Sequence, residues 1–301
     1  MEIQFSFRSL LTRCLLISFA VTSLVLFSCK SKPAAFPTDM PLPSAVLSFE
    51  GIKASDPEHL DLLFSLEINN PLSFSGAAKL ASWEAALNGR SAQRAFGLES
   101  ERVFPITEGS VSFPLMLSMD IAVLAELGLA PADDYDVGLI LDLEFSMEAR
   151  AAFPPALTIQ VRGFAEFPGV RPPVFSITSI AILKAELINT RFRVGLNIDN
   201  PNPYPVELSA LSYELYGNGL LWADGTEKNV FKINGKSALR GNLFLIMNFI
   251  NMKRDLLDQI INLEDVNYRF AGEALVGTGI DYLPSFRSSF DLAGYSEVLE
   301  N

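Results

Sequence analysis

The sequence predicts an all-β protein, built as two tandem antiparallel β-sandwiches that each contain one short α-helix. Three observations lead to this fold class. Apolar and polar residues alternate with a period of two over many short segments. Asn-Pro and Asn-Gly pairs, which favour turns, follow several of these segments. The second half of the chain also repeats the pattern of the first half.

The composition excludes several classes of protein. Of the 301 residues, 49% are hydrophobic and only 19% are charged, which excludes a disordered chain. One His and two Cys leave too few ligands for most zinc sites, His-based triads or a network of disulfides. The formal charge of −12 argues against a nucleic-acid partner, because that binding needs a basic surface. We expect an ordered, acidic protein without a metal or another cofactor.

Residues 1–28 have the layout of an export signal. Arg8 and Arg13 precede an apolar run from Cys14 to Phe27. This run is short for a membrane-spanning helix, which needs about 20 apolar residues. The alternative is an uncleaved anchor helix in which Cys29 is incidental. Both interpretations place the rest of the chain outside the cytoplasm.

The segment Leu26-Phe27-Ser28-Cys29 resembles the lipobox of bacterial lipoproteins. In that motif the Cys sulfur receives a diacylglycerol, and a small preceding residue lets the signal peptidase reach the bond. The resemblance implies that Cys29 carries acyl chains such as palmitate and attaches the protein to a membrane of the bacterial cell envelope. It also implies an extracytoplasmic location, at the periplasmic or outer-membrane face. Residues 29–44 then form a Pro-rich tether between the membrane and the folded part.

Two domains are expected, at residues 45–168 and 174–297, joined by a stiff Pro-rich connection. Shifting the chain by 130 residues, from Leu66 to Leu196, aligns eight identical residues without a gap. In the first copy these are Leu66, Ile68, Asn70, Pro71, Ser82, Glu84, Asn88 and Gly89.

Each domain is expected to open with alternating strands, at 62–68 and at 192–198. Both strands stop at Asn-Pro, because proline cannot donate to a sheet and the Asn side chain can close a turn. A second strand in each copy ends at Asn-Gly, which favours the primed hairpin turns. Later strands are expected at 137–147, 157–161, 266–270 and 286–292.

One helix is expected at the same place in each copy. In the first copy, apolar residues with helical spacing between 121 and 127 follow Asp120, which is a good N-cap, and precede Gly128, which is a good stop. In the second copy, Asn251 precedes an apolar face made by Leu256, Leu257, Ile260 and Ile261.

Residues 193–206, with the sequence RVGLNIDNPNPYPV, are followed by LSYELY at 211–216 and by Gly219. This pattern resembles the late embryogenesis abundant type 2 family, also called the water stress and hypersensitive response (WHy) domain. The resemblance covers residues 174–297. It extends to the first copy through the internal repeat, although Leu72-Ser73 replaces the second Asn-Pro there. It implies a fibronectin- or immunoglobulin-like sandwich with a helix, a role in desiccation or stress response, and binding of lipid or another apolar ligand.

Residues that could carry catalysis or bind a metal are few. His59 has no second His or Cys beside it, so an exposed turn is expected. Asp133, Asp134 and Asp136 lack the Gly and the distal Glu of a calcium loop, so a solvated turn is expected there. Gly277-Thr278-Gly279 lacks the third Gly of a phosphate loop and indicates a turn or bulge. No residue stands out as catalytic, and we expect a protein that is not an enzyme.

The candidate ligand surface is the apolar run that leads into the second predicted helix. Methionine provides adaptable surface at binding sites, and ordinary core packing is the alternative interpretation. The candidate residues are Phe244, Met247, Phe249 and Met252.

Two functions follow as hypotheses. The first is a lipid-anchored envelope protein that acts without catalysis in stress protection or in binding a lipid or other apolar ligand. The second is a structural adaptor whose exposed edge strands pair with another envelope protein.

Overall fold

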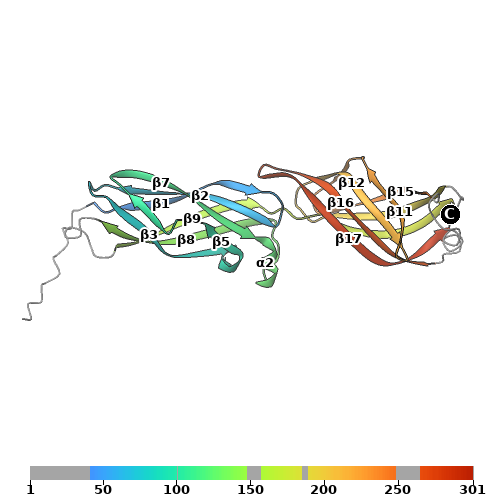
Figure 1. Ribbon diagram of the computed structural model, residues 1–301, viewed down its shortest axis with the longest axis horizontal. Helices are drawn as coiled ribbons and strands as arrows, with labels where there is room; N and C mark the ends of the chain where they lie inside the picture. Colours follow the sequence, from blue (N-terminus) through green and yellow to red (C-terminus); the bar gives the residue numbers. More distant parts are fainter. Residues whose placement is uncertain (1–40, 100, 148–156, 185–188, 249–264, 301) are drawn as a thin grey trace, which may run out of the picture.

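The computed structural model describes residues 41–99, 101–147, 157–184, 189–248 and 265–300. This part of the chain consists almost entirely of β-strands, and the predicted all-β sandwich fold is confirmed. Two sandwiches lie end to end, with the start of β1 (Ser44–Ala54) and the end of β17 (Leu283–Glu300) at opposite ends of the long axis (Figure 1). Within the described ranges, no helix has the length and apolar character that crossing a membrane requires.

The first sandwich has two sheets. In spatial order, one sheet consists of β1, β2 (His59–Asn70), β7 (Gly109–Asp120) and β5 (Phe96–Glu99). The other consists of β4 (Arg90–Ser91), β3 (Gly76–Leu87), β8 (Asp134–Met147) and β9 (Leu157–Pro168), with β6 (Val103–Ile106) paired to β3. A 3-10 turn, η1 (Gln93–Ala95), precedes β5, and a helix, α2 (Ile121–Glu126), follows β7.

The strands of the second sandwich form one continuous sheet. One half consists of β13 (Leu220–Glu227), β12 (Val206–Gly217), β16 (Asp265–Ile280) and β17, with β14 (Phe231–Ile233) paired to β12. The other half consists of β10 (Val174–Lys184), β11 (Asn189–Asn200) and β15 (Ser237–Asn248). A short parallel pairing of β10 with β17, at 180–182 and 298–300, joins the two halves.

Both sandwiches use the same strand order. The series β1-β2-β7 corresponds to β10-β11-β15, and β4-β3-β8-β9 corresponds to β13-β12-β16-β17. They differ at one edge, because β5 pairs with β7 in the first sandwich whereas β15 ends its sheet in the second.

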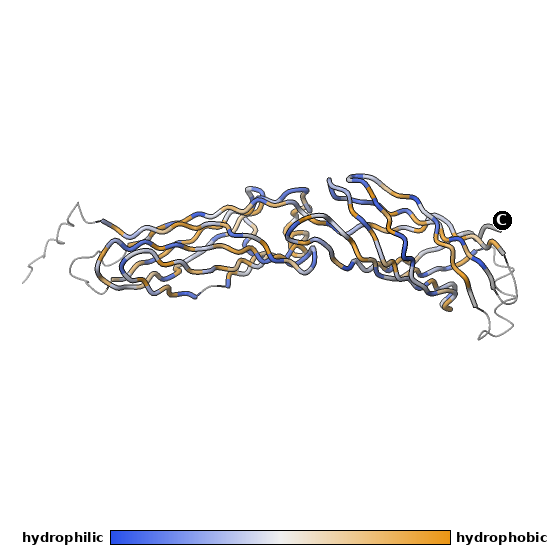
Figure 2. The backbone as a smooth tube through the Cα atoms, turned by 90° about the horizontal axis from the view of Figure 1, so that it is seen from above, coloured by the Kyte–Doolittle hydropathy of each residue, from blue (hydrophilic) through white to orange (hydrophobic). Residues whose placement is uncertain are grey.

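Strand alternation gives each sandwich its own core. The inward residues of β2 are Leu62, Phe64, Leu66 and Ile68, each at most 1% exposed. Those of β11 are Phe192, Val194, Leu196 and Ile198, each at most 3% exposed. Figure 2 shows the alternation as orange and blue segments along the strands. Burying one such side chain contributes about 1.5–3 kcal/mol, so the alternating pattern fixes which face of each strand points inward.

Two buried asparagines end β2 and β11. The Oδ1 atom of Asn70 accepts from the Leu72 N–H at 3.1 Å, and its Nδ2 donates to the Phe74 carbonyl at 2.8 Å. Asn200 makes the same contacts with the residues two and four positions further on, at 3.0 and 2.8 Å. The predicted Asn-Pro turns are confirmed, since the Asn side chain supplies turn hydrogen bonds that the proline cannot donate.

The other local signals have mixed outcomes. The first helix is confirmed: the Asp120 side chain accepts from the Ala122 N–H, and Gly128 has a φ of +69°. The second predicted helix, at 256–261, lies outside the described residues. Positive φ angles at both Asn-Gly pairs confirm the primed hairpin turns. The strands β16 and β17 are longer than predicted, because they pair with each other without interruption over 265–277 and 285–297, and the pairing resumes after a bulge at Ile280 and Leu283.

Candidate functional site

Phe244, in the predicted ligand surface, lies on β15 and points away from the core. It is 66% exposed, and Ile246 is 60% exposed. Their neighbours Leu243 and Leu245 are only 3% and 1% exposed. Strand alternation therefore divides the apolar run into an exposed set, which could form a ligand surface, and a buried set, which packs in the core.

The remaining predicted residues are only partly described. Met247 lies near the end of β15, opposite Thr190 of β11. Phe249, Met252 and the predicted lipidation site Cys29 lie outside the described residues.

Three arginines share the outer face of this sheet with Phe244. In the β11–β15 ladder Arg193 lies opposite Phe244, and Arg191 lies opposite Ile246. Arg240 lies on the same face of β15, four residues before Phe244. None of the three forms an ion pair with another residue in the described ranges. A positive surface with exposed apolar side chains thus occurs on a chain of formal charge −12.

An apolar crevice lies between the two halves of the second sandwich, beside β15. It has a volume of about 10 Å³, which is room for about one water molecule. Its lining residues are Leu196, Ile198, Leu211, Phe231, Leu239, Gly241, Asn242 and Leu243. The crevice is too small to enclose an acyl chain.

His59 lines a depression of about 390 Å³ beside α2. Its side chain is 65% exposed, as predicted, and its Nδ1 lies 3.1 Å from Asp56 Oδ1. This hydrogen bond raises the pKa of His59. The hydroxyl of Ser118, in the same depression, donates to Asp61 at 2.7 Å rather than to His59. A Ser nucleophile needs contact with its base, and this arrangement does not provide it.

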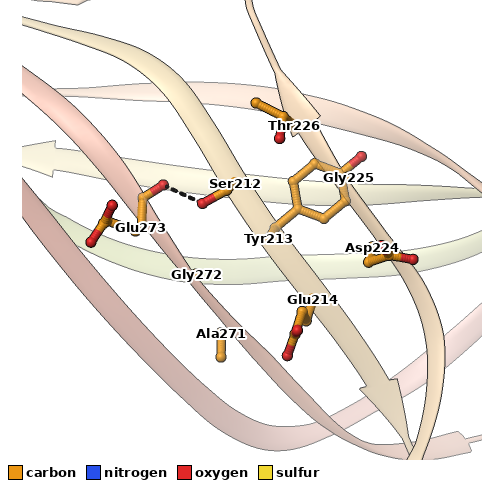
Figure 3. A pocket seen from close by; sticks show the side chains of 9 residues that line it. All are labelled: Ser212, Tyr213, Glu214, Asp224, Gly225, Thr226, Ala271, Gly272 and Glu273. Atoms are coloured by element: carbon orange, nitrogen blue, oxygen red, sulfur yellow. Dashed lines mark hydrogen bonds between the residues drawn. The ribbon is translucent and has the colours of Figure 1, made fainter.

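A second depression, of about 350 Å³, lies over β12, β13 and β16 (Figure 3). Glu214, Asp224 and Glu273 bring three carboxylates to it, and the ring of Tyr213 stands at its centre next to Gly225. Burial, assisted by nearby carboxylates, raises the pKa of Tyr213. Across the described ranges, no cluster of three or more His, Cys, Asp or Glu residues is arranged to hold a metal ion.

Several ion pairs and hydrogen bonds connect the two sandwiches at their joint. Asp133 of the first sandwich accepts from Lys236 of the second at 2.6 Å. It also pairs with Arg171 in the connection between them. Lys236 additionally donates to the Pro201 carbonyl at 2.9 Å. Asp133 lies at a bend with its side chain 42% exposed, as a solvated turn implies, but two cations also hold its carboxylate. The predicted turn is wrong for Asp134 and Asp136, which are exposed residues of β8.

Further contacts fix the connection itself. Asn202 exchanges two hydrogen bonds with the backbone of Arg171, both at 2.8 Å. Tyr204 donates to the Gly169 carbonyl at 2.8 Å. A Cβ atom on Gly169 would lie 2.5 Å from the Ala132 carbonyl oxygen, so no larger residue fits there. Asn202-Pro203, which directly follows the turn pair Asn200-Pro201, therefore has a role at the joint that sequence analysis did not assign.

A hydrogen bond and an aromatic contact made by Tyr282 complete the joint. The hairpin between β16 and β17 reaches the first sandwich, where the Tyr282 hydroxyl donates to the Pro168 carbonyl. The ring of Tyr282 stands edge-on to Phe167, with centroids 6.0 Å apart. Burial raises the pKa of Tyr282 well above its ordinary range. The sequence contains no local signal for this contact, because its two sides lie more than 100 residues apart.

Comparisons with solved structures give weak likenesses. A protein from Archaeoglobus fulgidus is 18% identical over 42% of this chain and 96% of that chain, with a TM-score of 0.28. The E. coli chaperone DraB is 12% identical over 82% of this chain and 98% of that chain, with a TM-score of 0.22. A β-glucuronidase from Bacteroides uniformis is 11% identical over 77% of this chain and only 26% of that chain, with a TM-score of 0.22. These values are too low to transfer an activity or a partner.

Comparisons with sequences give one family. No curated protein matches the chain. Residues 195–285, which form most of the second sandwich, match the model of the late embryogenesis abundant type 2 family, described as "Late embryogenesis abundant protein".

Proposed function

We propose that this chain is a lipid-anchored envelope protein without catalytic activity, whose two sandwiches form a stiff arm that presents a binding surface. The observation that carries the proposal is the joint around Asp133, where the first sandwich, the connection and the second sandwich bind one another. Such a joint limits the relative motion of two domains more than a linker alone would.

The arm extends away from its point of attachment. Acylated Cys29 would anchor it, and residues 29–44 would act as the tether. These 16 residues would span about 50 Å at the roughly 3.1 Å per residue of an extended Pro-rich segment. The second sandwich lies beyond the first along the long axis (Figure 1). The arm therefore keeps the surface around Phe244 far from the anchoring membrane.

A role in desiccation or stress response is supported by the family match of residues 195–285. The equal strand order of the two sandwiches and the internal repeat support a second copy of the same domain in residues 45–168. In this role the protein would bind a lipid or another apolar ligand on the outer face of β15. The crevice beside that strand is too small for an enclosed chain, so this binding would occur at the surface.

The anchor is tested by fatty-acid labelling. Cells that express the parent chain are expected to incorporate radiolabelled palmitate into it, and cells that express Cys29→Ala are not. Equal incorporation in both would contradict the anchor.

The apolar ligand is tested by native mass spectrometry of the full chain in mild detergent. Lipid should copurify with the parent chain and be lost from Phe244→Ser. A matched control is Phe164→Ser, because Phe164 is 67% exposed on β9 of the first sandwich. Equal lipid content in all three proteins would count against the surface around Phe244.

A further inference from the structure

β15 ends its sheet, whereas the corresponding strand of the first sandwich, β7, pairs with a further strand. In the first sandwich, β5 pairs with residues 116–119 of β7. β15 takes the place of β7, since Asn70 lies opposite Gly109 in one sandwich and Asn200 lies opposite Ser237 in the other. Among the described strands, none pairs with the second edge of β15, which is 12 residues long.

The shared register identifies the residues at this open edge. Met116 lies seven residues after Gly109, as Phe244 lies seven residues after Ser237. The segment that β5 covers, 116–119, therefore corresponds to 244–247. Met116 is only partly exposed beside β5, whereas Phe244 is 66% exposed. Both exposed apolar side chains of β15 thus stand where the first sandwich has a neighbouring strand.

The chain segment that could close this edge is held elsewhere. β13 occupies the sequence position of β4 and β5, but it stays paired with β12 along its whole length. Trp222 fixes it there by stacking on Phe192 of β11, with ring centroids 5.3 Å apart. β13 therefore contacts β15 but does not pair with its edge as β5 pairs with β7.

The crevice beside β15 lies where a large side chain is present in the first sandwich. Gly241 lies opposite Leu196, as Phe113 of the first sandwich lies opposite Leu66. Phe113 packs on Phe104 with ring centroids 5.1 Å apart. In the second sandwich Phe231 takes the place of Phe104. Phe231 lies opposite Leu208 and Phe104 lies opposite Ala78, and the shift of 130 residues aligns Ala78 with Leu208. Phe231 lines the crevice, and a Cβ on Gly241 would meet no atom within 4 Å.

We infer that β15 accepts an extended strand from another protein, which pairs with its free edge and inserts one apolar side chain into the gap at Gly241. The inference rests on the proposed binding role of the second sandwich and names its partner. Backbone hydrogen bonds would give affinity, and the gap would select the inserted side chain. Arg191, Arg193 and Arg240 on the outer face favour acidic residues on the outward side of the added strand.

The chain itself contains a strand of this chemistry. In β5, Phe96 is buried and Leu98 is partly buried, while Gly97 and Glu99 point outward. A labelled peptide with the sequence of residues 93–102, QRAFGLESER, is therefore the probe. In the register of β5 on β7, Phe96 would lie opposite Met247, so the gap at Gly241 requires a register shifted by six residues, which brings Phe96 opposite Gly241. It is expected to bind the full chain in detergent and to slow hydrogen exchange of the backbone amides in 237–248.

Two changes separate the parts of the inference. Gly241→Phe restores the side chain that the first sandwich has at this position, so the fold should remain intact while the peptide binds at least tenfold more weakly. A peptide with alternate amides N-methylated should also bind at least tenfold more weakly, because it cannot pair with the edge. The matched control is Gly97→Ala in the full chain, at a site with free space in the first sandwich. This variant should bind the unchanged peptide as the parent chain does.

Three results would overturn the inference: no binding of the peptide to the parent chain, equal binding by Gly241→Phe, or equal binding of the N-methylated peptide. Binding of anionic vesicles to the surface with no binding of the peptide would identify a membrane as the occupant instead. Fatty-acid labelling at Cys29 remains a separate readout. A labelled chain that fails to bind the peptide contradicts the strand acceptor alone and leaves the anchor standing.

Discussion

Lys236 of the second sandwich donates to Asp133 of the first at 2.6 Å, across 103 residues of sequence. Arg171 joins the same carboxylate from the connection. One side chain therefore holds three parts of the chain together, and its removal is the direct test of a stiff arm.

Asp133→Ala is expected to widen the range of angles between the two sandwiches, because Lys236 and Arg171 lose their shared partner. Small-angle X-ray scattering should show a broader distribution of interatomic distances. Thermal stability should change little, since partly exposed ion pairs contribute little to folding. Asp136→Ala, on the exposed side of β8, serves as control. An unchanged scattering profile for Asp133→Ala would show that the remaining contacts of the joint hold it without this carboxylate.

The same pair predicts how the joint depends on pH. The hydrogen bond from Lys236 holds the pKa of Asp133 below its ordinary value of 3.8. The folded pKa is thus lower than the unfolded pKa, so the contribution of the pair is complete above the unfolded value and is lost as pH falls through the folded value. The parent joint should be stiff at pH 7 and should loosen only below about pH 4.

Scattering measured between pH 7 and pH 3 would check this dependence. Asp133→Asn provides the comparison, because its side chain does not titrate. The change at acidic pH should be larger in the parent than in the variant. Equal changes in both proteins would assign the acid response to other carboxylates.

Asn200 is expected to contribute strongly to the stability of the second sandwich. It is 2% exposed, and its Nδ2 donates to the carbonyls of Ile233 and Asn234 at 3.2 and 3.1 Å, besides its local turn bonds. Asn200→Ala should lower the free energy of unfolding by about 2–4 kcal/mol, because several buried groups lose their partner. Asn197→Ala, nearer the surface of the same strand, should cost far less. Urea unfolding of both variants would measure the difference.

A replacement by Asp sharpens this test. Asn200→Asp places a carboxylate against carbonyl oxygens, which repel it when it is charged. The loss of stability should therefore be larger at pH 7 than at pH 4. A loss independent of pH would indicate that the side chain leaves its buried position.

Local sequence patterns are sufficient to predict the strands, the Asn-Pro turns and α2, because neighbouring residues determine these features. The strand 192–198 alternates strictly, and the Asp120 cap is in direct contact with its helix. Strand lengths are less predictable, since β16 extends to Ile280 through its pairing with β17 and a bulge between Gly277 and Ile280.

The functional surfaces depend on pairs that are distant in sequence. No local pattern brings Lys236 to Asp133 or Tyr282 to Pro168. The gap at Gly241 could have been found by aligning 109–120 with 237–248, which needs a shift of 128 residues. The uniform shift of 130 that reveals the repeat does not bring Gly241 opposite Phe113. The segment that connects β12 to β15 is two residues shorter than the one that connects β3 to β7, so the shift of 130 misaligns Gly241 and Phe113.

Trp222 and Gly217 provide the last prediction. The indole of Trp222 lies over Gly217, where an added Cβ would come within 2.0 Å of its ring. Trp222 also stacks on Phe192 and so holds β13 on β12 rather than on the edge of β15. Gly217→Ala should therefore displace the indole and lower the free energy of unfolding by about 1–3 kcal/mol, the usual cost of overpacking.

Displacement of Trp222 should also be visible in its emission. The chain contains two tryptophans, so the shift is measured in a background of Trp83→Phe. Emission should move to longer wavelength as the 3% exposed indole meets water, while Gly97→Ala, which has free space around it, should leave it unchanged. An unshifted emission with lowered stability would mean that β12 moves instead of the indole. The stacking of Trp222 on Phe192 would then hold the indole more firmly than β12 holds Gly217 in place.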